Sequence, residues 1–449
     1  MTDQQNTELK PKRELNLMQT VSIIIGTVIG SGVFISLPII AKIAGDPFTS
    51  TIIWLLGGLM WIPPILLLAE MGSAYPDQGF GYFYLQKAGS PFLAFVYTWT
   101  AFLTSDTPTL TIVALSAASV LTIFAPILEN MFAARLLASA LILGLAFINY
   151  RSVKTGGNFQ IILTLAKLLP LLAVVLIGFA MFSNDTYFVT NELLKNKTTS
   201  LFLIIAAGTS ATSWSYAGFG NILYMAGEVK NPQRNLPIAL IGSVLFVIAA
   251  YTLISIGTSM IVPYKDLIAQ EGDFVNPFAF LSYSESFAAP LFAIVAFVSM
   301  IGVLNASIMV QPRLEYAMAK DKMFFASFGK LHPKYLTPHY SIMIEATFAV
   351  VLFLLGDINN MLGYFTLSYV LQNTLVYGSI FFLHKREDYQ PTYKAPVWKF
   401  MAALSILIQL FLIYGTFLAY PIYGVYACLG LIISGLPVYL YFRKNWKLN

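Results

Sequence analysis

Long apolar stretches separated by short polar segments run through the whole chain. Twelve of them are long enough to cross about 30 Å of hydrocarbon as a helix, which takes about 20 residues. They cover residues 15–43, 49–75, 91–124, 131–149, 156–183, 200–228, 235–261, 288–319, 339–356, 359–384, 397–418 and 422–442. The pattern predicts an all-α membrane protein with 12 transmembrane helices in a single domain, residues 1–449.

Small residues interrupt the first and the sixth stretch near their middles. Gly30, Ser31 and Gly32 stand in the first, and Ser-Tyr-Ala-Gly-Phe-Gly, residues 215–220, stands in the sixth. Such residues lower helix propensity at the depth where unpaired backbone groups are hardest to satisfy. Close packing against another helix is the alternative use of small residues. Two interruptions at corresponding positions favour the paired broken helices of a transporter binding site.

The two interrupted stretches each open a group of five. Residues 15–183 then form a first repeat, residues 200–384 form a second, and the two helices of residues 397–442 are appended. Because each repeat holds an odd number of spans, the repeats are inverted relative to each other in the membrane. The sequence therefore predicts a LeuT-like five-plus-five inverted repeat in which helices 1 and 6 are broken.

The composition excludes a soluble enzyme. Of the 449 residues, 57% are hydrophobic and 10% are charged, and the mean hydropathy is +0.73. The single cysteine, Cys428, permits neither a disulfide framework nor a Cys/His metal cluster, and no nucleophile or phosphate-loop constellation stands in the sequence. We therefore expect no catalytic site, no metal and no cofactor.

The basic residues are unevenly distributed between the two predicted sides of the membrane. Twenty of the 26 Lys and Arg residues fall on one side, and cytoplasmic loops retain such residues. Both termini are therefore predicted to be cytoplasmic, in a multi-pass protein of the cytoplasmic membrane. The same bias explains the net charge of +5 without a nucleic-acid partner, although the basic loops also suit anionic lipid. Glu70 and Glu345, near the cytoplasmic ends of their spans, are interpreted as structural charges.

Four segments resemble those of the amino acid, polyamine and organocation (APC) transporters. Residues 25–34, Ile-Gly-Thr-Val-Ile-Gly-Ser-Gly-Val-Phe, resemble the first-helix signature of that family. Further matches follow in order at residues 69–82, with Ala-Glu-Met-Gly-Ser-Ala-Tyr-Pro, at residues 228–237, with Glu-Val-Lys-Asn-Pro, and at residues 305–321, with Tyr-Ala-Met-Ala-Lys-Asp. The resemblance covers most of the chain from about residue 14 to residue 390.

Within that family the chain resembles the L-amino acid transporter (LAT) branch, through Lys167 and Tyr251. The resemblance implies sodium-independent exchange of small neutral L-amino acids. Animal members of the branch join a heavy subunit through an external cysteine, which this sequence lacks, so no disulfide-linked heavy subunit is expected. Trp214 stands where many relatives have Phe and resembles the arginine/agmatine exchangers instead, which leaves the substrate size open.

Backbone groups on both sides of the two interruptions are predicted to hold an amino acid zwitterion. Free N–H groups at the start of a half-helix suit a carboxylate, and unpaired carbonyls at the end of one suit an ammonium group. By resemblance, these positions are also the binding backbone of the family. The predicted substrate-binding residues are Val28, Gly30, Ser31, Gly32, Trp214, Ala217 and Gly218.

Lys167, Trp214 and Tyr251 are predicted to control the conformation. Burying the ammonium of Lys167 near mid-bilayer costs ~3 kcal/mol or more, so it must face protein or water unless it snorkels to the nearer interface. One interpretation has it replace the sodium ion of sodium-coupled relatives and tie spans 1, 5 and 8 together. The other has it shuttle a proton. Trp214 and Tyr251 are the candidate gates, with packing or interhelical hydrogen bonding as the alternative.

Three polar residues are further candidates for the site. Asp106 lies midway along the third stretch, close to Thr109, where it would accept a cationic side chain or take part in proton coupling. A carboxyl satisfied by neighbouring hydroxyls or kept protonated explains Asp106 equally well. Asn305 lies in the eighth stretch, where interhelical hydrogen bonding is the alternative role.

These observations leave four functions to separate. The leading one is alternating-access exchange of small neutral L-amino acids. The alternatives are proton-coupled amino acid symport, through Lys167 or Asp106, and exchange of an amino acid for its decarboxylated amine. A sensor that binds amino acids without transporting them would be expected to carry a large soluble extension, and the tails beyond the predicted spans are only a few residues long.

Overall fold

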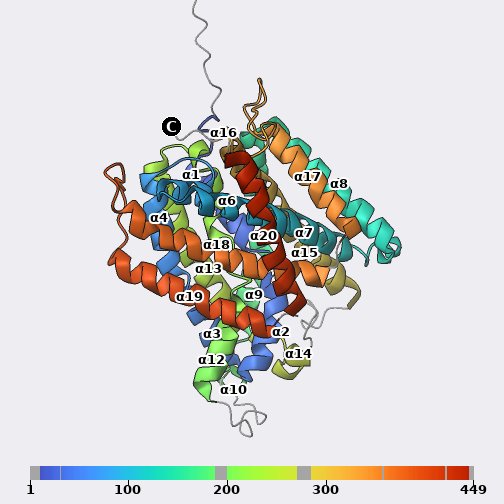
Figure 1. The fold of residues 1–449 in the computed structure, drawn as a ribbon. Helices are drawn as coiled ribbons and strands as arrows, with labels where there is room; N and C mark the ends of the chain where they lie inside the picture. The colour runs from blue at the N-terminus through green and yellow to red at the C-terminus, as the bar shows by residue number, and fades with distance from the viewer. Residues whose placement is uncertain are drawn as a thin grey trace, which may run out of the picture.

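The computed structural model describes residues 11–30, 32–187, 200–269, 285–355, 358–419 and 422–443. Every regular element within these ranges is helical, and two isolated β-bridges join Leu15 to Val229 and Gln78 to Met225. Figure 1 shows a bundle in which α1 begins and α20 ends at the same end of the molecule, whereas α10, α12 and α14 lie at the opposite end.

The chain forms the following helices up to its middle. They are α1 (Leu17–Val28), α2 (Gly32–Ala44), α3 (Pro47–Leu59), α4 (Ile62–Ala74), α5 (Phe80–Lys87), α6 (Pro91–Thr100), η1 (Ala101–Asp106), α7 (Thr107–Ser119), η2 (Pro126–Glu129), α8 (Met131–Arg151), α9 (Val153–Ala180) and α10 (Asn184–Tyr187).

The second half continues with a comparable series. Its helices are α12 (Leu201–Thr212), η3 (Phe219–Tyr224), η4 (Ala226–Glu228), α13 (Pro232–Ile261), α14 (Tyr264–Ala269), α15 (Glu285–Val310), α16 (Pro312–Lys320), α17 (His339–Leu355), α18 (Ile358–Leu383), α19 (Trp398–Ala419) and α20 (Ile422–Arg443).

Five helical segments have both the length and the apolar character needed to cross a bilayer. Within the described residues they are Pro47–Ala74, Met131–Arg151, Val153–Ala180, Pro232–Ile261 and Pro290–Lys320. Their mean hydropathy ranges from 2.1 to 2.5, and at 21 to 31 residues each they reach across about 30 Å of hydrocarbon. The chain is therefore an integral membrane protein.

The first predicted interruption is present. A capping box between Asn16 and Gln19 begins α1, which ends at Val28; Ile29 then takes an extended conformation, with φ −78° and ψ 97°. A new helix, α2, begins at Gly32. The break leaves the last carbonyls of α1 and the first amides of α2 without partners in their own helices.

The sixth stretch is also broken, but its second half differs from the expectation. After α12 ends at Thr212, the chain turns, and Gly218 takes the left-handed conformation with φ +112°, which side-chain-bearing residues rarely adopt. The chain continues as the short 3₁₀ helices η3 and η4 and not as a second α-helical half. Met225 between them bridges to Gln78, so pairing with another segment replaces the α-helical pattern there.

The third stretch contains an irregularity that the sequence did not predict. Residues 101–106 form a π-helix between α6 and α7. Thr107 donates its hydroxyl to the carbonyl of Phe102, at 2.7 Å, and Pro108 has no N–H to continue the α-helical ladder. Local π-geometry of this kind is frequent at functional positions, and here it ends at Asp106.

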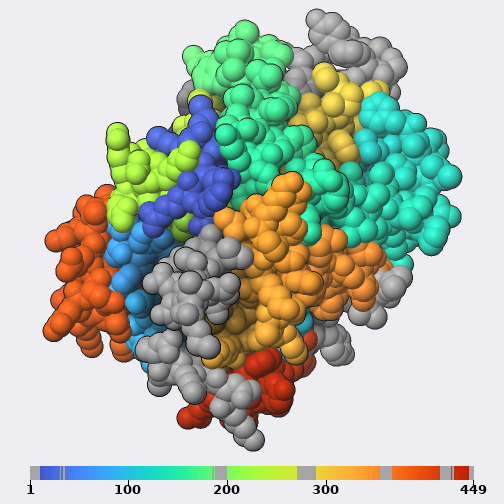
Figure 2. Space-filling view, turned by 90° about the horizontal axis from the view of Figure 1, so that it is seen from above, coloured from blue at the N-terminus to red at the C-terminus, as the bar shows by residue number. Residues whose placement is uncertain are grey.

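The elements that position the site pack around α1. This short helix contacts α9, α13 and α15, while α8 and α17 pack against each other at one edge of the bundle (Figure 1). Seen from above, the blue segment leading into α1 lies against the starts of α9 and α13 (Figure 2). Backbone hydrogen bonds hold this segment, because Leu15 donates to Glu228 at 3.0 Å and accepts from Lys230 at 2.8 Å.

Candidate functional site

The breaks in the first and sixth stretches lie against each other. The hydroxyl of Thr27, in the last turn of α1, donates to the carbonyl of Gly218 at 3.2 Å. Across the two segments, the hydroxyls of Ser36 and Ser215 form a hydrogen bond of 2.9 Å. Segments 179 to 191 residues apart in sequence therefore meet through four small or hydroxyl-bearing residues.

The glycines of the first break are closely surrounded. A Cβ atom at Gly32 would lie 3.2 Å from Cδ1 of Trp214, and one at Gly30 would lie 3.0 Å from Cγ2 of Val303. Glycine thus lets the start of α2 approach both the second break and α15. Ser31, between these glycines, lies outside the described residues.

Lys167 holds the end of α1. Its Nζ donates to the carbonyls of Ile25 at 3.3 Å and Gly26 at 3.0 Å, and also to the carbonyl of Ile29. The side chain is fully buried, with 0% of its surface exposed. An ammonium at a helix C-terminus satisfies orphan carbonyls and meets the negative end of the helix dipole. A snorkelling lysine would be exposed, so this side chain does not snorkel.

Tyr251 satisfies a further carbonyl of the same half-helix. Its hydroxyl, carried by α13, donates to the carbonyl of Val28 at 3.2 Å, and the side chain is fully buried. A carbonyl oxygen has two lone pairs, so Val28 retains the capacity to accept a second hydrogen bond. Lys167 and Tyr251 together donate to four carbonyls at or just beyond the end of α1, those of Ile25, Gly26, Val28 and Ile29.

Two backbone N–H groups of the second break already donate hydrogen bonds within the protein. Ala217 donates its N–H to the carbonyl of Trp214 at 3.4 Å, which closes a turn. Gly218 donates its N–H to the hydroxyl of Tyr369, in α18, at 3.0 Å. Tyr369 is not predictable from the sequence, because nothing in the apolar pattern of α18 indicates which face meets the break.

Asn305 belongs to a polar network that joins α8, α9 and α15. Its amide donates to Oε1 of Gln160 at 2.7 Å, and its carbonyl accepts from Asn149 at 2.9 Å. Thr164, one turn from Gln160, donates to the carbonyl of Ser22 in α1 at 3.1 Å. These contacts give Asn305 an interhelical role. Its partner Gln160 lies on the same face of α9 as Thr164 and Lys167.

Asp106 is buried at the end of the π-helix, with 6% of its surface exposed. One carboxylate oxygen lies 3.5 Å from the hydroxyl of Ser105, and the other has no hydrogen-bond partner in the described part of the chain. Thr109 uses its own hydroxyl locally, donating to the carbonyl of Ser105 at 2.6 Å. Asp106 therefore retains an acceptor in the protein interior.

An ion pair closes the end of the bundle where α1 begins. Arg313 donates from Nε to Glu228 at 2.8 Å and from Nη2 at 3.3 Å, and both side chains are 1% exposed. Gln78 adds a hydrogen bond to Glu228 at 3.1 Å. Because the backbone of Glu228 also accepts from Glu14 and Leu15, this pair joins α16 to the segment before α1 and the loop before α5.

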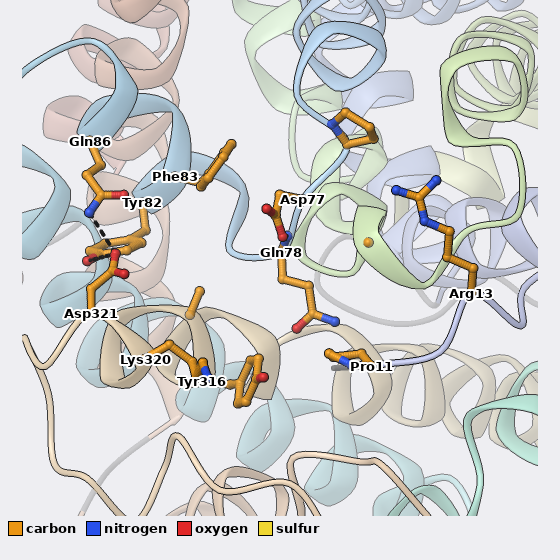
Figure 3. Close-up of a pocket in the computed structure, with 13 residues that line it drawn as sticks. Pro11, Arg13, Asp77, Gln78, Tyr82, Phe83, Gln86, Tyr316, Lys320 and Asp321 are labelled. Atoms are coloured by element: carbon orange, nitrogen blue, oxygen red, sulfur yellow. Dashed lines mark hydrogen bonds between the residues drawn. The ribbon is translucent and has the colours of Figure 1, made fainter. Parts of the chain in front are cut away.

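A cavity of about 420 Å³ opens beside this ion pair. Figure 3 shows Asp321 at one side of it, with Tyr82 and Gln86 directed at its carboxylate, and Arg13 at the opposite side. Tyr82 and Gln86 donate to Asp321 at 2.8 and 2.7 Å. Burial raises the pKa of the Asp321 carboxyl, and these hydrogen bonds counteract part of that effect.

The buried acids differ from one another in their partners. Glu70 accepts hydrogen bonds from Tyr389 at 2.9 Å and from the backbone of Ala395 at 2.7 Å, which docks the segment between α18 and α19. Glu345 and Glu315 are both 0% exposed, and neither carboxylate has a hydrogen-bond partner among the described residues. Glu315 is not conspicuous in the sequence, because it lies in a polar segment at the end of its span.

The meeting of the two breaks supplies groups suited to recognising a ligand. The described residues contain no group of three His, Cys, Asp or Glu side chains placed to hold a metal ion. What the breaks do supply is backbone polarity at the ends of two short helices, beside an indole ring. Such an arrangement suits a small polar ligand with charges of both signs.

Comparison with known proteins agrees with this picture. The amino acid permease family matches residues 15–431. The chain is 27% identical to the b(0,+)-type amino acid transporter 1 of Mus musculus, over 98% of this chain and 91% of the relative. It is 26% identical to the serine/threonine exchanger SteT of Bacillus subtilis (strain 168), over 97% and 98%. It is also 23% identical to the large neutral amino acids transporter small subunit 2 of Homo sapiens, over 95% and 80%.

Proposed function

The chain belongs to the amino acid permease family, and from this membership we propose that it exchanges small neutral L-amino acids by alternating access, without sodium. The family match over residues 15–431 makes it a membrane transporter and not an enzyme. The relatives include a serine/threonine exchanger, which supports exchange and small neutral substrates.

The observation that carries the proposal is the difference between the two sides of the first break. Lys167 and Tyr251 occupy carbonyls at the end of α1. The start of α2, at Gly30 and Gly32, faces Val303 and Trp214 with no Cβ of its own. Amides at a helix N-terminus favour an anion, so we assign the substrate carboxylate to Gly30, Ser31 and Gly32.

The substrate ammonium would then bind the carbonyls on the other side of the site. The second acceptor position of Val28 and the carbonyls of Trp214 and Ala217 are the groups that we assign to it. Gly218 completes the binding backbone, and its contact with Thr27 at 3.2 Å supports a site formed by both breaks. Trp214 and Tyr251 would act as gates, because Trp214 approaches the first break from the turn after α12 and Tyr251 donates to it from α13.

Sodium independence follows from Lys167. Its ammonium already lies against the carbonyls of Ile25, Gly26 and Ile29. A Cβ atom placed at Gly302, in α15, would lie 3.6 Å from Nζ of Lys167. The ammonium therefore also faces α15, the eighth predicted span. We propose that this fixed charge takes the place of a sodium ion and ties α1, α9 and α15 together.

We extend the proposal to the arrangement in the membrane. The chain would have 12 spans, with residues 15–183 and 200–384 as inverted five-helix repeats and residues 397–442 appended. Both termini would be cytoplasmic, which places the Glu228–Arg313 ion pair at the inner face as a gate. No external cysteine is available for a disulfide-linked heavy subunit, so the chain would act without one.

Competition in proteoliposomes tests the substrate assignment. Counterflow of labelled serine would be measured against unlabelled neutral amino acids, their methyl esters, and decarboxylated amines such as agmatine. We expect small neutral amino acids to compete, and esters and amines to fail, because each lacks one end of the zwitterion. Strong competition by an amine would refute the model and would favour Asp106, whose free carboxylate oxygen could hold a cation.

A further inference from the structure

We propose that Glu315 and Glu345 form a proton-binding pair beside the Glu228–Arg313 gate, and that the pair releases a proton to the cytoplasmic side when this gate opens. Proton binding by the pair is independent of the transport assignment, whereas its link to gating rests on the proposed function. The experiments below separate the two.

The pair brings two acids from different helices into the protein interior. Glu315 is carried by α16 and Glu345 by α17, and these helices pack against each other. Both residues are 0% exposed. All four carboxylate oxygens lack a hydrogen-bond partner in the described ranges, and a carboxylate without donors is strongly disfavoured in such a place.

The charge around the pair is not balanced. Glu315 and Glu345 repel each other, and Asp106 repels both. Arg313 attracts Glu345, but its Nε and Nη2 bind Glu228, and its Nη1 is buried without a hydrogen-bond partner. Arg313 is thus bound to Glu228, while Glu315, Glu345 and Asp106 repel one another.

The remaining titratable neighbours do not supply positive charge. The hydroxyls of Tyr97 and Tyr224 face the same region and bind each other at 3.1 Å. Among the groups acting on this region in the described chain, Arg313 is thus the cation, and it is paired. With Glu228 neutralised by Arg313, the burial of Glu315 and Glu345 as two anions would be far more costly than binding protons.

A proton is the ligand that fits best. The described His, Cys, Asp and Glu side chains form no group that could hold a metal ion, so a cation shared among several carboxylates is not supported. A proton needs no cavity, and it converts each unpartnered carboxylate into a neutral acid. Protonation of either acid also removes the repulsion between Glu315 and Glu345.

The pair is placed to respond to the gate. Arg313 and Glu315 are two residues apart on α16, so a movement that parts Arg313 from Glu228 also moves Glu315. Water entering from that side would stabilise the carboxylate, and the O–H bond of the acid would break, with the proton passing to water. The proton returns from the same side when the gate closes, so the cycle carries no net proton across the membrane.

The sign of the pH dependence follows from this scheme. Acid at the cytoplasmic face keeps the pair protonated and favours the closed gate, whereas alkaline conditions at that face favour opening. The gate equilibrium should change by up to about tenfold per pH unit for each proton released. The pH at the external face should have little effect on this step.

Infrared difference spectroscopy tests proton binding directly. The purified full chain would be compared at acid and alkaline pH for the carbonyl stretch of protonated carboxyl groups. We expect Glu315→Gln and Glu345→Gln each to remove part of this signal, while Glu129→Gln, at an exposed position in η2, leaves it unchanged. Spectra of both variants identical to those of the unmodified chain would overturn the proposal.

Counterflow in proteoliposomes of uniform orientation tests the link to the gate. We expect the unmodified chain to slow as the cytoplasmic-face pH falls, and Glu315→Gln/Glu345→Gln to lose that dependence while Glu129→Gln retains it. A double variant that keeps the full dependence would refute the link. Absence of counterflow in the unmodified chain at every pH would instead refute the proposed function, and the infrared result would still decide proton binding.

Discussion

At the scale of the residue, Lys167 shows how a costly group is retained inside a membrane protein. Its fully buried ammonium has three backbone carbonyls as partners, all from the broken end of α1. A charge without partners would be expelled or neutralised, whereas here the break supplies acceptors that otherwise would have none. The lysine and the break thus stabilise each other.

Lys167→Ala should weaken exchange without abolishing it. Removing the ammonium frees the carbonyls of α1 and loosens its contact with α9, so one conformation loses stability. A coupling free energy of ~1–3 kcal/mol would change the apparent affinity about 5- to 150-fold at one membrane face. Affinity measured from each face would test this, with Lys154→Ala, exposed near the start of α9, as the matched control.

The same variant separates two roles of Lys167. If the lysine were the group that shuttles a proton, Lys167→Ala would lose the pH dependence of exchange and keep its affinity. If it is a fixed charge, the affinity changes and the pH profile stays. If the variant and the unmodified chain had the same affinity and the same pH dependence of exchange, both roles would be contradicted.

Gly32→Leu should abolish substrate binding and leave folding nearly intact. A Cβ alone would come within 3.2 Å of Trp214, and the rest of the leucine would fill the space assigned to the carboxylate. Binding to the purified protein, followed with a labelled amino acid, would measure the loss. Gly144→Leu is the control, because a Cβ there meets nothing within 4 Å; binding by Gly32→Leu at the unmodified level would exclude the anion site.

At the scale of the element, the sequence predicts where helices break but not what meets the broken ends. Gly30 to Gly32 lower helix propensity in any context, so the first break is a local property. The hydrogen bond between Tyr369 and Gly218, by contrast, joins residues 151 positions apart and depends on packing. The π-helix before Thr107 escaped prediction for a similar reason, because apolar periodicity does not report a single extra residue in a turn.

The Glu228–Arg313 ion pair should lose more stability when one charge is removed than when both are removed. Glu228→Gln leaves the guanidinium of Arg313 buried without its anion, which is expected to cost about 3–5 kcal/mol of folding stability. Glu228→Gln/Arg313→Met removes both charges and should recover much of this loss. Thermal unfolding of the solubilised protein would compare the two; a double variant no more stable than Glu228→Gln would contradict this account.

The double variant should also change the conformational balance. Without the ion pair, α16 is no longer tied to the segment before α1, so we expect the inward-open state to gain population. Affinity for substrate at the cytoplasmic face would then rise relative to the external face. Unaltered affinities at both faces would mean that Glu228 and Arg313 stabilise the fold and do not gate transport.

At the scale of the whole molecule, composition and apolar length were enough to predict an all-helical membrane protein. The permease family match over residues 15–431 confirms the family resemblance read from the four motifs. The positions of the acids were harder to predict, because Glu315 and Glu345 become a pair only when α16 packs on α17. The apolar pattern of the sequence predicts which segments are buried, whereas tertiary packing determines which buried side chains face each other.

The central claim is exchange that depends on an internal amino acid and not on an ion gradient. Uptake of labelled serine into proteoliposomes would be measured with and without unlabelled serine inside, in sodium, potassium or choline medium, and with or without a pH gradient. We predict that uptake requires internal serine and is equal in the three media, because Lys167 supplies the cation. Accumulation into empty vesicles driven by sodium or by a pH gradient would contradict the account.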